Sequence, residues 1–173
     1  MIHHIEFEQW LPFTINKVFL FFANPNNLPR IMPPATGTEL TAIRLVRPPQ
    51  FLDAQQSFSE EIPLAGAGSE IVTSFRLFPF LPVRAQWIAL ITQFKWNHHF
   101  ADVQKKGPFK SFQHRHEFLI EMRDGVSGTV VRDAIEYDAG FGPLGDLAQK
   151  VFIAPILRRI FHHRQQMLEK LLG

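Results

Sequence analysis

Hydrophobic and polar residues alternate over most of the chain before residue 140, as in strands that bury one face. The period-two patterns predict strands over residues 2–10, 39–46, 69–77, 83–94 and 128–139, with two more on either side of Lys106-Gly107-Pro108. After the first strand, Thr14 is placed to cap a short helix that holds Val18, Phe19, Phe21 and Phe22. A second helical turn follows over residues 27–32, before Pro33-Pro34.

The pattern changes after residue 140 to a helical one. A long helix is predicted over residues 146–172, with an apolar stripe made by Leu147, Val151, Ala154, Leu157, Phe161, Leu168 and Leu171. Pro155 lies inside this helix and should bend it. Residues 47–68 are rich in Pro, Gly, Ser, Gln and Glu and are interpreted as a long, partly mobile loop. We expect one α+β domain over residues 1–173, in which a curved antiparallel sheet grips the long helix around an internal cavity.

The hairpin around Gly107 has an unusual mixed face. Alternation places His98, Phe100, Asp102 and Gln104 on one side, and on the facing strand Phe112, His114, His116 and Phe118. One face of a sheet is normally either apolar or solvated, whereas a ligand cavity needs apolar walls with a few polar groups. The mixed face therefore predicts a ligand-binding pocket, with Trp87 as a further wall residue.

Turn positions give a register for these strands. The turn at Gly107-Pro108 predicts that Asp102 lies near Phe112, Phe100 near His114, and His98 near His116. The Asp124-Gly125 turn predicts that His116 lies near Asp133, and His114 near Ile135.

A histidine beside a carboxylate can act as a general base, because the carboxylate fixes the tautomer of the imidazole. His116 and Asp133 are therefore the catalytic candidates. The ligand-binding candidates are Trp87, Phe100, Asp102, Gln104, Phe112, His114, His116 and Asp133. Three uses of the polar residues stay open: mutual structural hydrogen bonding, ligand binding without chemistry, and acid–base catalysis.

The eight histidines form four close pairs, an arrangement that raises the question of a metal site. His114 and His116 share a face and could both reach a metal, with His98 or Asp133 as a third ligand. We expect no metal and no cofactor, since buried histidines more often satisfy one another.

Composition narrows the function classes. The chain has no cysteine, which excludes disulfides and thiolate chemistry, and 18 phenylalanines suit a deep apolar interior. A net charge of +2 does not indicate a nucleic-acid partner, and the basic stretch Arg158, Arg159, His162, His163 and Arg164 is expected on a solvated helix face. No signal peptide or membrane-spanning segment is visible, so a cytoplasmic location is expected. No pattern indicates an oligomeric state.

Several motifs, in this order, resemble those of the Bet v 1-like (START/SRPBCC) superfamily, in particular bacterial polyketide cyclase/dehydrase-type ligand-binding proteins. They are Trp10-Leu-Pro, residues 18–29, Met32-Pro-Pro, Phe100-x-Asp-x-Gln, Gly107-Pro-Phe, His114-x-His, the Gly128-to-Tyr137 segment and Gly142-Pro-Leu-Gly. Phe112 stands where a Trp is common in such proteins, and residues 47–68 look longer than usual.

The resemblance implies the helix-grip fold and binding of a small hydrophobic ligand, such as a lipid, a polyketide-like or an aromatic molecule. The alternatives are a cyclase/dehydrase-type enzyme that uses His116 and Asp133, or a protein-interaction module with a vestigial cavity.

Overall fold

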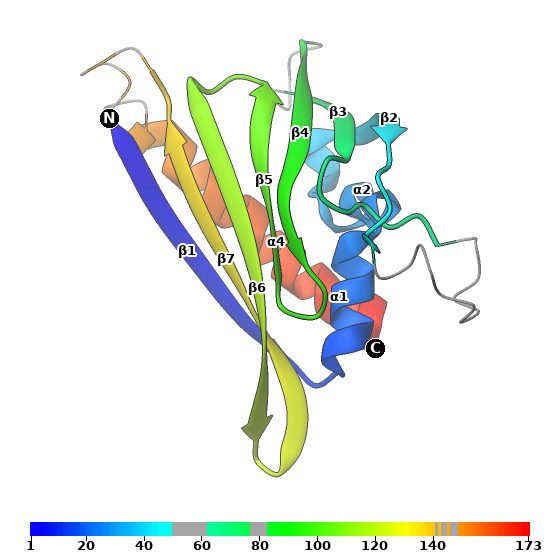
Figure 1. Ribbon diagram of the computed structural model, residues 1–173. Coiled ribbons are helices and arrows are strands. Elements are labelled where there is room, and N and C mark those ends of the chain that lie inside the picture. The colour runs from blue at the N-terminus through cyan, green and yellow to red at the C-terminus, as the bar shows by residue number, and fades with distance from the viewer. Residues whose placement is uncertain (50–61, 77–82, 141, 143–144, 146–148) are drawn as a thin grey trace.

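The computed structural model describes residues 1–49, 62–76, 83–140, 142, 145 and 149–173. Its centre is a seven-stranded antiparallel sheet in the order β1-β7-β6-β5-β4-β3-β2, with α4 lying across one face (Figure 1). The strands are β1 (Ile2–Leu11), β2 (Glu39–Arg44), β3 (Glu70–Arg76), β4 (Arg84–Lys95), β5 (His99–Lys106), β6 (Ser111–Arg123) and β7 (Val126–Asp138). The predicted α+β helix-grip order of elements is confirmed.

The helices after β1 form where the sequence predicts them. Thr14 accepts a hydrogen bond from the backbone N–H of Lys17 and caps α1 (Ile15–Ala23). Asn24 caps the 3₁₀ turn η1 (Pro25–Asn27), which leads into α2 (Leu28–Ile31) and then the 3₁₀ turn η2 (Pro34–Thr36). Val18 and Phe19 are fully buried, so α1 closes one end of the space between the sheet and α4.

The turn at Asp124-Gly125 fixes the pairing of β6 with β7. Both residues have positive φ, 49° and 78°, as a tight hairpin turn with the twist of the strands requires. His116 pairs with Asp133 and His114 with Ile135, which confirms the predicted register.

The pairing of β5 with β6 differs from the prediction by two residues. Asp102 lies opposite His114, and Phe100 lies opposite His116. A shift of two residues leaves every side chain on its predicted face, because side chains alternate with a period of two. His98 is the exception, since β5 begins only at His99 and His98 lies exposed in the preceding turn.

The C-terminal helix is predicted over residues 146–172, and residues 146–148 lie outside the described ones. A π-helical turn, η4 (Gln149–Ile153), precedes α4 (Ala154–Leu172), so Pro155 lies in the first turn of α4 rather than inside it. Proline is tolerated there because the first N–H groups of a helix have no intrahelical partner, and the bend expected at Pro155 stays a prediction. The predicted stripe position Val151 is exposed, and Leu147 lies outside the described residues.

The buried face of α4 consists of Phe161, Arg164, Leu168 and Leu172. Burial of Arg164 corrects the expectation that this arginine lies on the solvated face. Arg158, Arg159 and His162 are exposed as expected.

Two groups of buried side chains hold α4 against the sheet. One is built around α1 and includes Phe19, Phe100, Phe118 and Leu168; the other joins Ile5, Ile135, Tyr137 and Phe161. Phe7 stacks on Phe161 with ring centroids 4.3 Å apart. Burial of these large apolar side chains is the main source of stability that the sequence supplies.

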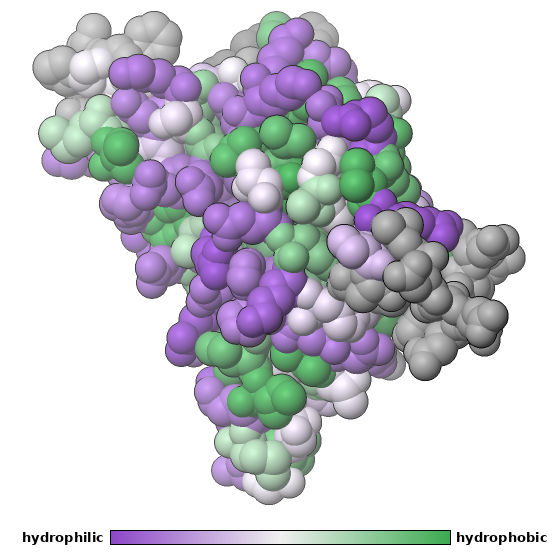
Figure 2. All heavy atoms as spheres, viewed as in Figure 1, coloured by the Kyte–Doolittle hydropathy of each residue, from purple (hydrophilic) through white to green (hydrophobic). Residues whose placement is uncertain are grey.

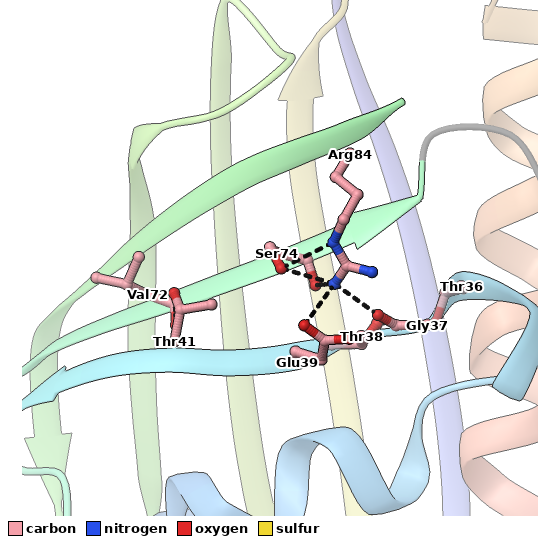
Figure 3. A network of polar contacts seen from close by, with 8 residues as sticks. All are labelled: Thr36, Gly37, Thr38, Glu39, Thr41, Val72, Ser74 and Arg84. Carbon is pink, nitrogen blue, oxygen red and sulfur yellow. Dashed lines mark hydrogen bonds and ion pairs between the residues drawn. The ribbon is translucent and has the colours of Figure 1, made fainter. Parts of the chain in front are cut away.

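At the β2 edge, Arg84 links three strands and a turn (Figure 3). Its guanidinium donates to the hydroxyl of Ser74 at 2.6 Å and to the carbonyl oxygen of Gly37 at 2.8 Å, and it forms an ion pair with Glu39 at 3.2 Å. This network keeps the short strand β2 attached to the sheet.

The predicted loop at 47–68 falls mainly on residues outside the described ones. Its described ends are packed: Pro48, Leu64 and Ala65 are buried, and Ala65 donates a backbone hydrogen bond to Ala23 at 3.0 Å.

At the opposite end, the β6–β7 hairpin protrudes beyond the sheet. Its exposed hydrophobic residues are Leu119, Ile120, Met122 and Val126. Figure 2 shows hydrophobic surface in its lower part, where Figure 1 places this hairpin. No helix in the described part of the chain is long and apolar enough to cross a membrane.

Candidate functional site

A cluster of ionisable side chains lies on the face of the sheet that α4 covers. Strand register brings Asp102 of β5 opposite His114 of β6, and His116 of β6 opposite Asp133 of β7. Because residues two apart on a strand point to the same side, all four side chains point inward. Arg164 reaches the cluster from α4.

Asp133 is the centre of this cluster. Its Oδ1 accepts a hydrogen bond from Nε2 of His114 at 3.0 Å and lies 2.5 Å from Nδ1 of His116. The second contact is close, but its angle lies outside hydrogen-bond geometry. All three residues are at most 7% exposed. One carboxylate oxygen therefore fixes the orientation of both imidazoles.

The charge states follow from burial and from these contacts. Burial lowers the pKa of both His114 and His116, because a charged imidazole loses its hydration there. Burial alone would raise the pKa of Asp133, but the two imidazoles outweigh it and hold that pKa well below its usual range. At neutral pH the group is therefore an ionised carboxylate between two neutral histidines.

Asp102 has a different environment. Burial raises the pKa of its carboxyl group, with His114 and Arg164 opposing that shift. No hydrogen bond or ion pair joins Asp102 to another residue in the described ranges. The shift of its pKa therefore comes from burial and from nearby charges, not from a hydrogen bond. Asp102 thus holds its proton more readily than an exposed aspartate does. Its carboxyl oxygens are available to contact a ligand.

Ligand atoms of Asp102, His114 and His116 lie within 4.8 Å of one another, so these residues could hold a metal ion. Two histidines and one carboxylate are a known ligand set for divalent metals, and Asp133 would orient the two rings from behind. His98, one of the two third ligands considered from the sequence, is not part of this group; its Nδ1 lies 2.9 Å from Nδ1 of His99.

Arg164 is the functional candidate that the sequence reasoning missed. It is 8% exposed, its guanidinium carbon lies 4.5 Å from the centroid of the Phe161 ring, and it interacts electrostatically with Asp102, Asp133 and His116. Its spacing gave a signal, because Arg164 lies three residues after Phe161 and four before Leu168, on the same helical stripe.

Aromatic rings enclose the cluster on both sides. Phe100 and Phe22 lie against His116, with ring centroids 4.4 Å and 5.4 Å away. On the other side His114 contacts Phe161 and Phe112, and Trp87 meets the Phe112 ring edge to face at 4.7 Å. Phe100, Phe112 and Trp87 thus lie where wall residues are expected.

Gln104 does not join the cluster. Its side-chain amide donates to the carbonyl oxygen of Phe109 at 2.7 Å and accepts from the backbone N–H of Phe109 at 3.2 Å. Both hydrogen-bonding ends of the amide therefore close the β5–β6 turn.

The described residues also line a groove of about 450 Å³ on the opposite, outer face of the sheet. It is lined by Glu6, Phe7, Glu8, Glu117, Arg132, Asp133 and Ala134. The internal cavity between the sheet and α4 stays a prediction.

No family model and no curated protein matches the chain. Solved structures are similar over nearly its whole length. Ara h 8.0201 has a TM-score of 0.60 at 13% identity and covers 99% of this chain and 98% of its own. Ginseng major latex-like protein 151 from Panax ginseng has a TM-score of 0.57 at 12% identity, covering 98% and 96%.

Norcoclaurine synthase from Thalictrum flavum, solved in complex with dopamine and hydroxybenzaldehyde, has a TM-score of 0.61 at 12% identity, covering 99% of this chain and 87% of its own. Identities this low concern the fold alone. The chain has the helix-grip fold of Bet v 1-like proteins, as its motifs predict.

Proposed function

We propose that the protein binds a small hydrophobic molecule between the sheet and α4, and that the inward-facing cluster holds the polar group of that molecule. The lipid, polyketide-like and aromatic classes all fit an apolar site with a few polar groups. One observation carries the proposal: Asp102 and Arg164 point into the interior without a hydrogen-bonding partner among the described residues. Arg164 is buried and Asp102 is half-buried. Polar side chains in such places are normally paired, so these two favour a polar partner on a ligand.

The surroundings of the cluster support the same function. Phe100 and Phe22 on one side, and Phe112 and Phe161 on the other, offer flat apolar surfaces next to the polar atoms. A ligand with an apolar body and one polar end matches this distribution. That a protein of the same fold was solved with two small aromatic molecules adds support for an aromatic ligand.

Native mass spectrometry of the protein purified from its own host, with identification of any retained molecule, tests the proposal. We expect a specific hydrophobic compound that is lost on denaturation. A control variant, Gln113→Ala on the outer face of β6, should retain it, whereas Phe112→Ala on the inner face should reduce its occupancy. Equal retention by both variants would count against an inner-face site.

An acid–base enzyme is the second candidate, because Asp133 orients His116 next to the aromatic wall. In a cyclase/dehydrase-type reaction His116 would take a proton from an enolisable substrate, and Asp133 would hold the ring in place. With the retained compound as substrate, His116→Ala should then abolish turnover and leave its affinity within a few-fold. Turnover should follow a bell-shaped pH profile. A protein that only binds the compound would show no turnover at any pH.

A protein-interaction module with a filled cavity is the remaining alternative. It predicts that uncharged apolar dyes and fatty acids fail to bind, while a consistent protein partner is captured. The cytoplasmic location and the absence of a nucleic-acid partner stay predictions from the sequence.

A further inference from the structure

Arg164 occupies a position where an arginine has to be explained. Phe161, Arg164 and Leu168 follow one another along the face of α4 that packs on the sheet, and all three are buried. A leucine would fill this position without a desolvation cost. The charge therefore carries out a task that packing alone does not need.

In the described part of the chain, no hydrogen bond uses the guanidinium donors of Arg164. The guanidinium lies over the ring of Phe161, and that contact engages its flat face but not the N–H groups in its plane. Asp102 and Asp133 act on it electrostatically, yet neither forms an ion pair or a hydrogen bond with it in the described structure. The described residues thus supply no acceptor for these N–H groups, which leaves them open to an acceptor on a ligand.

We infer that this acceptor is a carboxylate of the ligand and that Arg164 recognises it. The inference rests on the proposed function and specifies its ligand as a hydrophobic monocarboxylic acid. A planar guanidinium binds a planar carboxylate through two parallel hydrogen bonds, which neither an alcohol nor an ester can form. Phe100 and Phe112 would contact the apolar body of the acid.

The two aspartates do not exclude a ligand of single negative charge. The carboxylate of Asp133 is already engaged by His114 and His116. Asp102 forms no ion pair with Arg164 among the described residues, so the guanidinium stays available to the ligand. A doubly charged phosphate would meet more repulsion here, so the site favours a carboxylate.

The test compares acids with their uncharged analogues. Decanoic acid and decanol, and naphthylacetic acid and naphthylethanol, are titrated into EDTA-treated protein by displacement of the uncharged dye N-phenylnaphthylamine. EDTA treatment removes any metal ion through which an acid could bind to Asp102, His114 and His116. The variants are Arg164→Gln, Arg164→Lys and the control Arg159→Gln, which changes an exposed arginine of the same helix.

We expect the natural protein to bind each acid roughly 10- to 100-fold more tightly than its alcohol, as charge-assisted hydrogen bonds allow. Arg164→Gln should remove the preference and leave the alcohols within a few-fold, Arg164→Lys should keep part of it, and Arg159→Gln should keep all of it. Equal affinity for acid and alcohol in the natural protein would overturn the inference alone. If neither dye nor any probe binds, the proposed function fails, and the inference with it.

Discussion

His116 and Asp133 face each other across β6 and β7, and Nδ1 of the one lies 2.5 Å from Oδ1 of the other. The pairing follows from the Asp124-Gly125 turn, from which seven residues of each strand separate it, because that turn sets the register of the whole hairpin. The site is thus built on rigid strands rather than on loops.

Asp133→Asn should destabilise the protein by about 2 kcal/mol, since a neutral amide oxygen is a weaker acceptor for His114 than a carboxylate and the new NH2 group is buried and needs an acceptor. The free energy of unfolding in urea measures this loss. Asp124→Asn is the matched control: it makes the same substitution in the exposed turn of the same hairpin, where Asn tolerates positive φ. Equal urea midpoints for the two variants would contradict the central role of Asp133.

Stability should fall as pH decreases below about 6.5, the ordinary value for histidine. The pKa values of His114 and His116 are lowered in the folded state, so in this window the unfolded chain binds protons that the folded chain does not. Each histidine contributes a slope of at most about 1.4 kcal/mol per pH unit. Below about 4 the lowered pKa of Asp133 acts in the same direction. The raised pKa of Asp102 acts in the opposite direction, in the window above about 4, where the folded chain binds a proton that the unfolded chain does not.

Urea unfolding at a series of pH values tests this dependence. His116→Gln should flatten the slope between pH 6.5 and the folded-state titration, while His162→Gln, a change at an exposed position of α4, should leave it as it is. A slope that survives in His116→Gln and in His114→Gln would mean that the buried pair does not control the acid sensitivity.

The sequence predicted the fold and the inner face well, and each failure has a physical cause. Alternation identified the faces of β5 and β6 even though their register was wrong by two residues, because face depends only on odd or even position. The register itself depends on the turn, where the side chain of Gln104 replaces backbone pairing, and no local propensity encodes that contact.

Arg164 was missed for a related reason. The basic stretch around it, made of Arg158, Arg159, His162 and His163, is typical of a solvated helix face. The prediction followed this overall charge and not the position of Arg164 on the apolar stripe. Helical spacing from Phe161 and Leu168 was the better guide. A charged residue at a position of the apolar stripe indicates a buried charge, and hence a candidate functional residue.

Gly128→Ala should cost about 1–3 kcal/mol in the free energy of unfolding, the usual range for overpacking. A Cβ atom at Gly128 would lie 2.5 Å from the carbonyl oxygen of Leu11 and 2.5 Å from the ring of Trp10, and the backbone cannot move away without loss of β1–β7 pairing. Ser127→Ala, at the exposed neighbouring position, is the control. Similar urea midpoints for the two variants would contradict this prediction, because they would mean that β1 can move to accommodate the added methyl group at little cost in stability.

Gln104→Ala should destabilise the protein by about 1 kcal/mol, because water can partly replace the two hydrogen bonds to Phe109 at this half-buried turn. The larger effect should be on order: Phe109 packs on Trp87 and Tyr137, and without Gln104 its backbone is no longer held. We therefore expect a weaker near-ultraviolet circular dichroism signal from the aromatic residues, while Gln113→Ala on the outer face should leave it unchanged. If Gln104→Ala instead keeps that signal and loses affinity for the bound molecule, Gln104 acts directly on the ligand.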